Sequence, residues 1–99
     1  MIAGRDPLAV AALQYCAAGT AEETLQTLMP LIDRAANDGA RLLCLPEAAT
    51  FLAASRAALA DEAEPAGESP VLDRLCNTAA RHGIELSIGS MFFLGTDGR

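Results

Sequence analysis

The order of an apolar run, an amphipathic helix and a second apolar run constrains this fold most strongly. Residues 7–15 (PLAVAALQY) and 41–45 (RLLCL) are short and largely apolar, which is typical of strands covered on both faces. The alanines of the first run also favour a helix, which is the alternative there. A strand, a helix and a strand in this order nearly always form a right-handed crossover between parallel strands. We therefore predict an α/β fold.

The segment between the two runs carries the start and stop signals of a helix. Thr20 and Glu23 have the spacing of a capping box, and Gly39 is a natural helix stop. Pro30 lies inside the pattern, and because an interior proline costs ~3 kcal/mol we expect a kink or a shifted start. Apolar side chains recur with the helical period and form one face. They are Leu25, Leu28, Met29, Ile32, Ala35 and Ala36.

A second helix and a third strand follow in the same order of helix, glycine and strand. Ser69 is the expected cap, Pro70 the first helical residue and Gly83 the stop. The expected inner face of this helix consists of Val71, Leu72, Leu75, Cys76, Ala79 and Ala80. Residues 84–95 alternate in their first half, which predicts a strand. Its expected core side chains are Ile84, Leu86 and Ile88.

Two stretches are expected to be less regular. Residues 48–68 are alanine-rich, then acidic, and are interrupted by Pro65 and Gly67, so we expect a short helix followed by an exposed loop. The acidic run 61–64 is expected to be solvated, with a lid near a site as the alternative. Asp97-Gly98 is a hairpin signal, but the sequence ends one residue later. An open edge and strands too apolar for a one-sided sheet predict that residues 1–99 are the N-terminal portion of a single, incomplete domain.

Charge and cysteine content exclude several classes of partner. The net charge is −6 and all seven basic residues are scattered arginines, so no basic stripe exists for nucleic acid. No apolar run approaches the ~20 residues of a membrane span. A signal peptide over residues 7–21 is disfavoured because Arg5 is cancelled by Asp6 and the run contains Gln14. Three cysteines without paired spacing favour reduced thiols, and we expect a cytoplasmic protein without cofactor or metal.

Glu47 is the candidate catalytic residue. It follows the carboxyl end of the strand at 41–45, where functional groups gather in open α/β sheets. Pro46 ends the strand and restricts the backbone beside the carboxylate. An apolar setting strengthens a carboxylate as a general base near neutrality. The alternatives are a solvated loop glutamate and one whose charge favours the N-terminus of the following helix, and position alone leaves them open.

The cysteines and the only histidine are expected to have structural roles. Cys44 lies close to Glu47, but within an apolar strand it is expected to be a small buried side chain. Cys76 belongs to a helix face and Cys16 follows the first strand, and neither is beside a cation that would stabilise a thiolate. His82 lies in the last turn of a helix, where it interacts favourably with the helix dipole.

The chain resembles the opening of a nitrilase-superfamily carbon-nitrogen hydrolase. Residues 8–51 contain a strand ending in Leu-Gln, a helix ending in Ala-x-x-Gly-Ala, a second strand and then Pro46-Glu47. The resemblance continues through residues 69–90 and the final TDGR. It therefore covers nearly all of this chain but only the first part of a family domain.

The resemblance implies the N-terminal part of an α-β-β-α sandwich, with a mixed sheet and helices on one face. It also implies a cysteine that attacks an amide or nitrile carbon, a glutamate that acts as general base and a lysine that steadies the oxyanion. Glu47 matches the general base. The chain has no lysine, and none of its cysteines matches the family's nucleophile.

The implied substrate is a small molecule with an amide, carbamoyl amine or nitrile group. Nucleic acid and membrane are not expected partners, and the full-length enzyme is expected to be a homo-oligomer. Because the lysine and the nucleophile are missing, this chain alone is expected to be inactive. The alternatives are a non-catalytic α/β interaction module and an inactive fragment.

Overall fold

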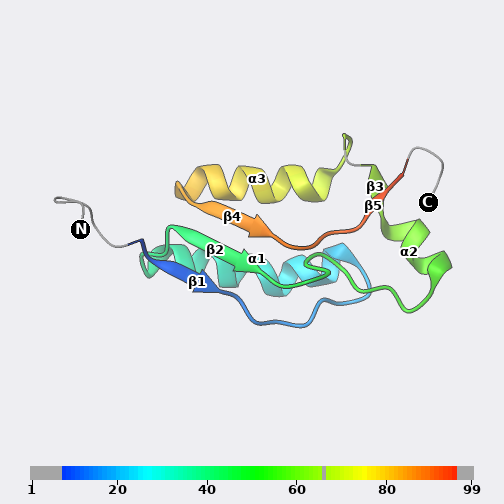
Figure 1. The fold of residues 1–99 in the computed structure, drawn as a ribbon, viewed down its shortest axis with the longest axis horizontal. Coiled ribbons are helices and arrows are strands. Elements are labelled where there is room, and N and C mark those ends of the chain that lie inside the picture. The colour runs from blue at the N-terminus through cyan, green and yellow to red at the C-terminus, as the bar shows by residue number, and fades with distance from the viewer. Residues whose placement is uncertain (1–7, 66, 96–99) are drawn as a thin grey trace.

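A three-stranded parallel sheet forms the centre of the molecule. The computed structural model describes residues 8–65 and 67–95. The strands β1 (Val10–Ala12), β2 (Leu42–Leu45) and β4 (Glu85–Ile88) lie in the order β1-β2-β4. Both ladders are parallel, and Figure 1 shows the three strands running in the same direction. The predicted strand–helix–strand units are therefore confirmed.

Two helices cover one face of this sheet. α1 (Ala21–Asn37) begins at Thr20, whose Oγ1 accepts the amide of Glu23 at 3.3 Å, so the predicted cap is confirmed. The helix continues through Pro30, which is exposed, and its start is not shifted. α3 (Pro70–His82) begins after its cap Ser69 and ends at Gly83, whose φ of 65° is left-handed.

The core lies between the helices and the sheet. Leu28 and Ile32 of α1, Leu43 of β2 and Leu75 of α3 are fully buried. The predicted face of α1 packs in this cluster, and so do Ile84, which precedes β4, and Leu86 and Ile88 of β4. Burial of each leucine or isoleucine side chain stabilises the fold by about 1.5–3 kcal/mol. Most of the stabilisation from apolar burial among the described residues therefore comes from this layer.

The inner face of α3 differs from the prediction. Cys76 and Ala80 are exposed, and the buried stripe instead includes Thr78. Residues 71, 75, 78 and 79 follow one helical stripe, which the sheet covers without reaching Cys76 or Ala80. The Thr78 hydroxyl donates a hydrogen bond to the Arg74 carbonyl at 2.8 Å, which satisfies its polar atom in the core.

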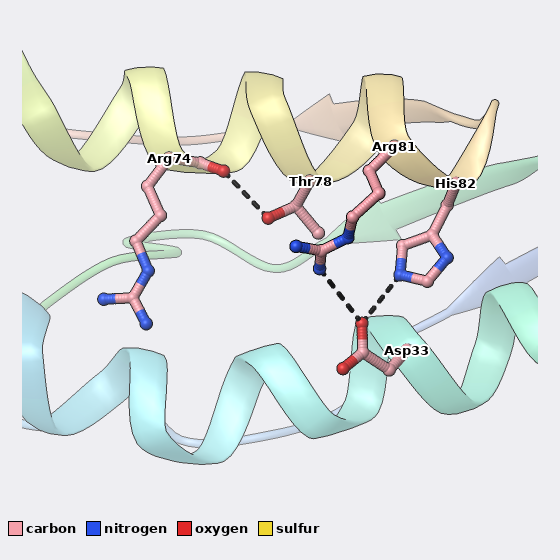
Figure 2. Close-up of polar contacts among 5 residues, drawn as sticks. All are labelled: Asp33, Arg74, Thr78, Arg81 and His82. Atoms are coloured by element: carbon pink, nitrogen blue, oxygen red, sulfur yellow. Dashed lines mark hydrogen bonds and ion pairs between the residues drawn. The ribbon is translucent and has the colours of Figure 1, made fainter.

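A polar contact joins the outer surfaces of α1 and α3. Figure 2 shows Asp33 of α1 facing Arg81 and His82 of α3, with the strands behind both helices. The His82 Nε2 donates to Asp33 Oδ1 at 2.7 Å, and Arg81 Nη2 lies 3.7 Å from the same oxygen. His82 therefore pairs across the two helices, a contact that its position near the end of α3 did not predict.

The opposite face of the sheet is not covered by the described residues. The rows on this face are Val10–Leu42–Glu85 and Ala12–Cys44–Ser87. Val10 is 55% exposed, so the prediction that both faces of its strand are covered does not hold within residues 8–65 and 67–95. The helices thus lie on one face, as predicted, and every described ladder is parallel. The expected hairpin at Asp97-Gly98 lies outside the described residues.

A second, two-stranded sheet lies beyond the carboxyl ends of the main strands. α2 (Arg56–Glu62) is followed by β3 (Glu64–Pro65), which pairs in parallel with β5 (Phe93–Leu94). Figure 1 places all three together at one end of the molecule. The predicted single strand over residues 84–95 is therefore wrong, because the chain leaves the main sheet after Ile88. The predicted short helix is confirmed, and a strand follows it.

Candidate active site

Glu47 lies at the carboxyl edge of the main sheet. It follows β2, the central strand, with Pro46 between them. Because β1 and β4 run parallel to β2, the segments after all three strands leave the sheet at this edge. These segments contain Tyr15 after β1, Glu47 after β2 and Ser90 after β4. This is the position in which open α/β sheets place their functional groups.

The loop that carries Glu47 is held from both sides. On one side, the amide of Ala48 donates to Ser90 Oγ at 3.2 Å and the amide of Ala49 donates to the Ser90 carbonyl at 2.8 Å. On the other side, the Tyr15 hydroxyl donates to the Ala49 carbonyl at 2.7 Å. Residues from both neighbouring segments therefore fix the backbone immediately after Glu47.

Ala48 has an unusual backbone conformation. Its φ of 50° is the only positive value of a non-glycine residue among residues 8–65 and 67–95. A left-handed conformation costs an L-residue roughly 1–2 kcal/mol because Cβ approaches the following carbonyl oxygen. Such a conformation persists only where the surrounding contacts determine it. Here they are the hydrogen bond that the Ala48 amide donates to Ser90 Oγ and the one that Tyr15 donates to the Ala49 carbonyl.

Tyr15 is a half-buried member of this edge. Its ring packs against the core cluster while its hydroxyl contacts the Ala49 carbonyl. Desolvation by burial raises the pKa of Tyr15 from 10.0 to about 12. The phenol is therefore neutral over the physiological range and acts as a hydrogen-bond donor to the Glu47 loop.

The Glu47 carboxylate has no structural partner among the described residues. The residue is exposed, and no hydrogen bond or ion pair joins its carboxylate to another described residue. The apolar enclosure expected around it is not supplied by residues 8–65 and 67–95. The alternative of a helix-capping charge is also unsupported, because α2 begins only at Arg56, with Ser55 as its cap.

The acidic run at 61–64 is not simply solvated. Glu62 is half-buried, and its Oε1 accepts the amide of Ala21 at 2.6 Å, at the N-terminus of α1. Glu64 is also half-buried, and its Oε1 accepts the Ser69 hydroxyl at 2.7 Å and the Val71 amide at 3.3 Å, at the N-terminus of α3. Both carboxylates therefore stabilise helix starts, since the helix dipole is positive there.

The cysteines do not gather at this edge. Cys16 and Cys76 are exposed, whereas Cys44 is half-buried on the uncovered face of the sheet rather than in the core. No group of three or more His, Cys, Asp or Glu side chains that could hold a metal comes together within the described ranges. In the same residues, no helix has the length and apolar character needed to span a membrane.

A hollow of about 630 Å³ lies between α2 and β5, apart from Glu47. Its lining is mostly apolar, with one cation, Arg56. Phe92 lines it and also packs on Phe51, with ring centroids 5.6 Å apart. Glu47 does not line this hollow, so the hollow does not coincide with the sheet edge that carries the candidate carboxylate.

Comparison with known proteins identifies the family. The family model described as carbon-nitrogen hydrolase matches residues 9–99. This chain belongs to the carbon-nitrogen hydrolase family. Its fold is similar to that of the NitFhit protein of C. elegans, with a TM-score of 0.81 and 23% sequence identity. The match covers 89% of this chain and 21% of the NitFhit chain, and no curated protein matches the sequence.

The comparisons and the geometry support the sequence-based interpretation to different extents. The nitrilase-like α/β fold and the family are confirmed. The catalytic role of Glu47 stays a prediction, although its place at the sheet edge agrees with it. Sequence reasoning missed Tyr15 and Ser90, because their hydrogen bonds to Ala48 and Ala49 span 34 or more positions. A polar residue just after each strand was the available signal.

Proposed function

We propose that this chain is the N-terminal part of an enzyme that hydrolyses a non-peptide carbon-nitrogen bond, with Glu47 as its general base. The observation that carries the proposal is the position of Glu47. Its carboxylate follows the central parallel strand, is accessible and has no structural partner among the described residues. Membership of the carbon-nitrogen hydrolase family supports the reaction class.

In the proposed reaction, Glu47 moves protons while a cysteine forms the covalent bond. The Cys thiol gives its proton to the Glu47 carboxylate, and its sulfur attacks the substrate carbon. With an amide substrate, the C–N bond breaks as the nitrogen takes that proton from Glu47. Water then gives a proton to Glu47 and attacks the thioester, the C–S bond breaks, and the cysteine recovers its proton.

The other two catalytic groups are proposed to belong to a longer form of the protein. Residues 1–99 contain no lysine that could steady the oxyanion. Cys44, the cysteine nearest to Glu47 in sequence, lies within β2 on the uncovered sheet face. We therefore propose that the lysine and the nucleophilic cysteine follow residue 99, and that a small amide, carbamoyl amine or nitrile is the substrate.

The proposal is tested with the 99-residue chain and a longer form that contains both missing groups. In the longer form, Glu47→Gln keeps the shape of the side chain but removes the base, so kcat should fall by roughly a hundredfold to ten-thousandfold. The 99-residue chain should hydrolyse no amide, carbamoyl amine or nitrile, with or without the substitution.

Two results would contradict the proposal. Full activity of the longer Glu47→Gln variant would remove Glu47 from the mechanism. Turnover by the 99-residue chain that disappears on Cys44→Ala would make Cys44 the nucleophile. Cys76→Ala is the matched control, because Cys76 is an exposed thiol on α3, away from the sheet edge.

A further inference from the structure

We propose that Ser90 and Tyr15 are positioning residues for Glu47. They hold the backbone that follows Glu47 in one conformation and thereby direct its carboxylate. This inference rests on the proposed function, in which Glu47 is the general base. It adds two residues that touch neither the carboxylate nor a reacting atom in the described structure, yet determine where the carboxylate lies.

Ser90 holds two consecutive amides of the Glu47 loop. Its Oγ accepts the amide of Ala48 at 3.2 Å, and its carbonyl oxygen accepts the amide of Ala49 at 2.8 Å. Ser90 lies just after β4, which pairs with β2 along its whole length. The position of Ser90 is therefore set by the main sheet rather than by the loop that it holds.

Tyr15 holds the same loop from the opposite neighbour of β2. Its hydroxyl donates to the Ala49 carbonyl at 2.7 Å, and its ring packs against the core cluster. Ala49 is itself fully buried, and both of its backbone polar groups are occupied, the amide by Ser90 and the carbonyl by Tyr15. Because β1 and β4 flank β2, the loop is held between two fixed points.

The conformation of Ala48 shows why such contacts matter. A φ of 50° is unfavourable for alanine, so a loop without its hydrogen bonds would move towards a more extended backbone. Glu47 is the preceding residue and would move with it. A general base works only within hydrogen-bond reach of the proton it takes, and a displacement of ~1 Å can cost about a hundredfold in rate.

The experiment uses a longer form that contains the missing lysine and cysteine, with kcat and KM measured across pH. Ser90→Ala removes the acceptor for the Ala48 amide, and we expect kcat to fall roughly tenfold to a hundredfold with KM nearly unchanged. Ser90→Thr keeps the hydroxyl and should restore most of the rate. Tyr15→Phe should also lower kcat. Ser87→Ala, on β4, is the matched control and should leave both constants unchanged.

A double variant separates positioning from a general structural role. If Ser90 acts through Glu47, then Ser90→Ala should slow the Glu47→Gln enzyme no further, because the base it positions is already gone. An equal loss in both backgrounds would overturn the inference. Thermal unfolding of each variant checks folding, and failure of Ser90→Thr to restore the rate in a folded enzyme would also count against it.

The outcomes distinguish this inference from the proposed function. Full activity of Glu47→Gln overturns the proposed function, and the inference with it. Loss of activity in Glu47→Gln together with unchanged kcat in Ser90→Ala and Tyr15→Phe overturns only the inference. Faster hydrogen exchange of the Ala48 and Ala49 amides in Ser90→Ala, together with the lower kcat, supports it.

Discussion

Three glutamates, Glu47, Glu62 and Glu64, lie at or just beyond the ends of different helices and strands, yet the fold uses them differently. Glu62 and Glu64 are half-buried, and each accepts hydrogen bonds at the N-terminus of a helix. Glu47 follows a strand and is exposed, and its carboxylate forms no hydrogen bond or ion pair with another described residue. The backbone of the next two residues, Ala48 and Ala49, is by contrast held by hydrogen bonds with Ser90 and Tyr15. The fold therefore uses the first two carboxylates for stability and fixes the main chain beside the third.

The largest stability effect within this comparison is expected at Glu64. Glu64→Ala removes the acceptor of both the Ser69 hydroxyl and the Val71 amide, and Ser69 is only 4% exposed. Leaving such a buried donor without a partner costs about 1–3 kcal/mol in the free energy of unfolding. Urea denaturation of the 99-residue chain, followed by circular dichroism, measures the loss. Glu68→Ala is the matched control at an exposed position, and an equal effect there would contradict the assigned role.

A somewhat smaller effect is expected at Glu62. Its carboxylate accepts one amide, that of Ala21, at the start of α1. Removal by Glu62→Ala should cost about 1–2 kcal/mol, as expected for a partly buried charge at a helix N-terminus. The loss should shrink in high salt because the dipole interaction is screened. Asp61→Ala, at the exposed neighbouring position, should leave the urea midpoint unchanged.

Tyr15 supplies a pH-dependent test of the Glu47 loop. The folded-state pKa of about 12 exceeds the unfolded value of 10.0, so the unfolded chain loses the phenolic proton first. Stability from the neutral phenol is complete below pH 10.0 and is lost as the pH rises through about 12. Tyr15→Phe should remove this loss, and it should cost about 0.5–1.5 kcal/mol near neutrality through the missing hydrogen bond to Ala49.

The phenolate absorbance gives a direct measurement of this titration. Tyr15 is the only tyrosine, and the chain contains no lysine or tryptophan. A midpoint near 10.0 in the folded chain would show that the hydroxyl is not desolvated and would separate Tyr15 from the loop. Identical alkaline stability curves for the parent chain and Tyr15→Phe would lead to the same conclusion.

The smallest stability effect is expected at Glu47. Because its carboxylate has no described partner, Glu47→Gln should leave the urea midpoint of the 99-residue chain unchanged. A clear destabilisation would show that the carboxylate has a structural role and would remove the contrast with Glu62 and Glu64. The same substitution in the longer form is the one expected to have a large effect on turnover.

The sequence predicted those features that depend on residues close together in the chain. The cap of Thr20 with Glu23, the stop at Gly83 and the alternation of Ile84, Leu86 and Ile88 are local patterns, and the structure confirms them. The position of Glu47 beyond β2 followed from the order of elements alone. Such features can be predicted from the sequence because the residues that make the contacts are close together in the chain.

The features that were missed depend on contacts between distant segments. The Glu62–Ala21 hydrogen bond joins residues 41 positions apart, and the Ala48–Ser90 bond joins residues 42 apart. The end of β4 was missed because residues 91–94 are again apolar. The Ser90 carbonyl accepts the Ala49 amide instead of joining a strand ladder. Only Glu64 and Ser69, five positions apart, offered a local signal.

The parallel register of β2 also determines how the sheet assembles. The ladder with β1 joins strands separated by α1, and the ladder with β4 joins strands separated by α2, β3 and α3, so no described hairpin links neighbours in the main sheet. Closing such long chain segments has an entropic cost before any ladder bond forms, which slows folding relative to local structure. The helices can form first, whereas β2 gains both partners only when the two crossovers have closed. We therefore expect the edge that carries Glu47 to be completed late during folding.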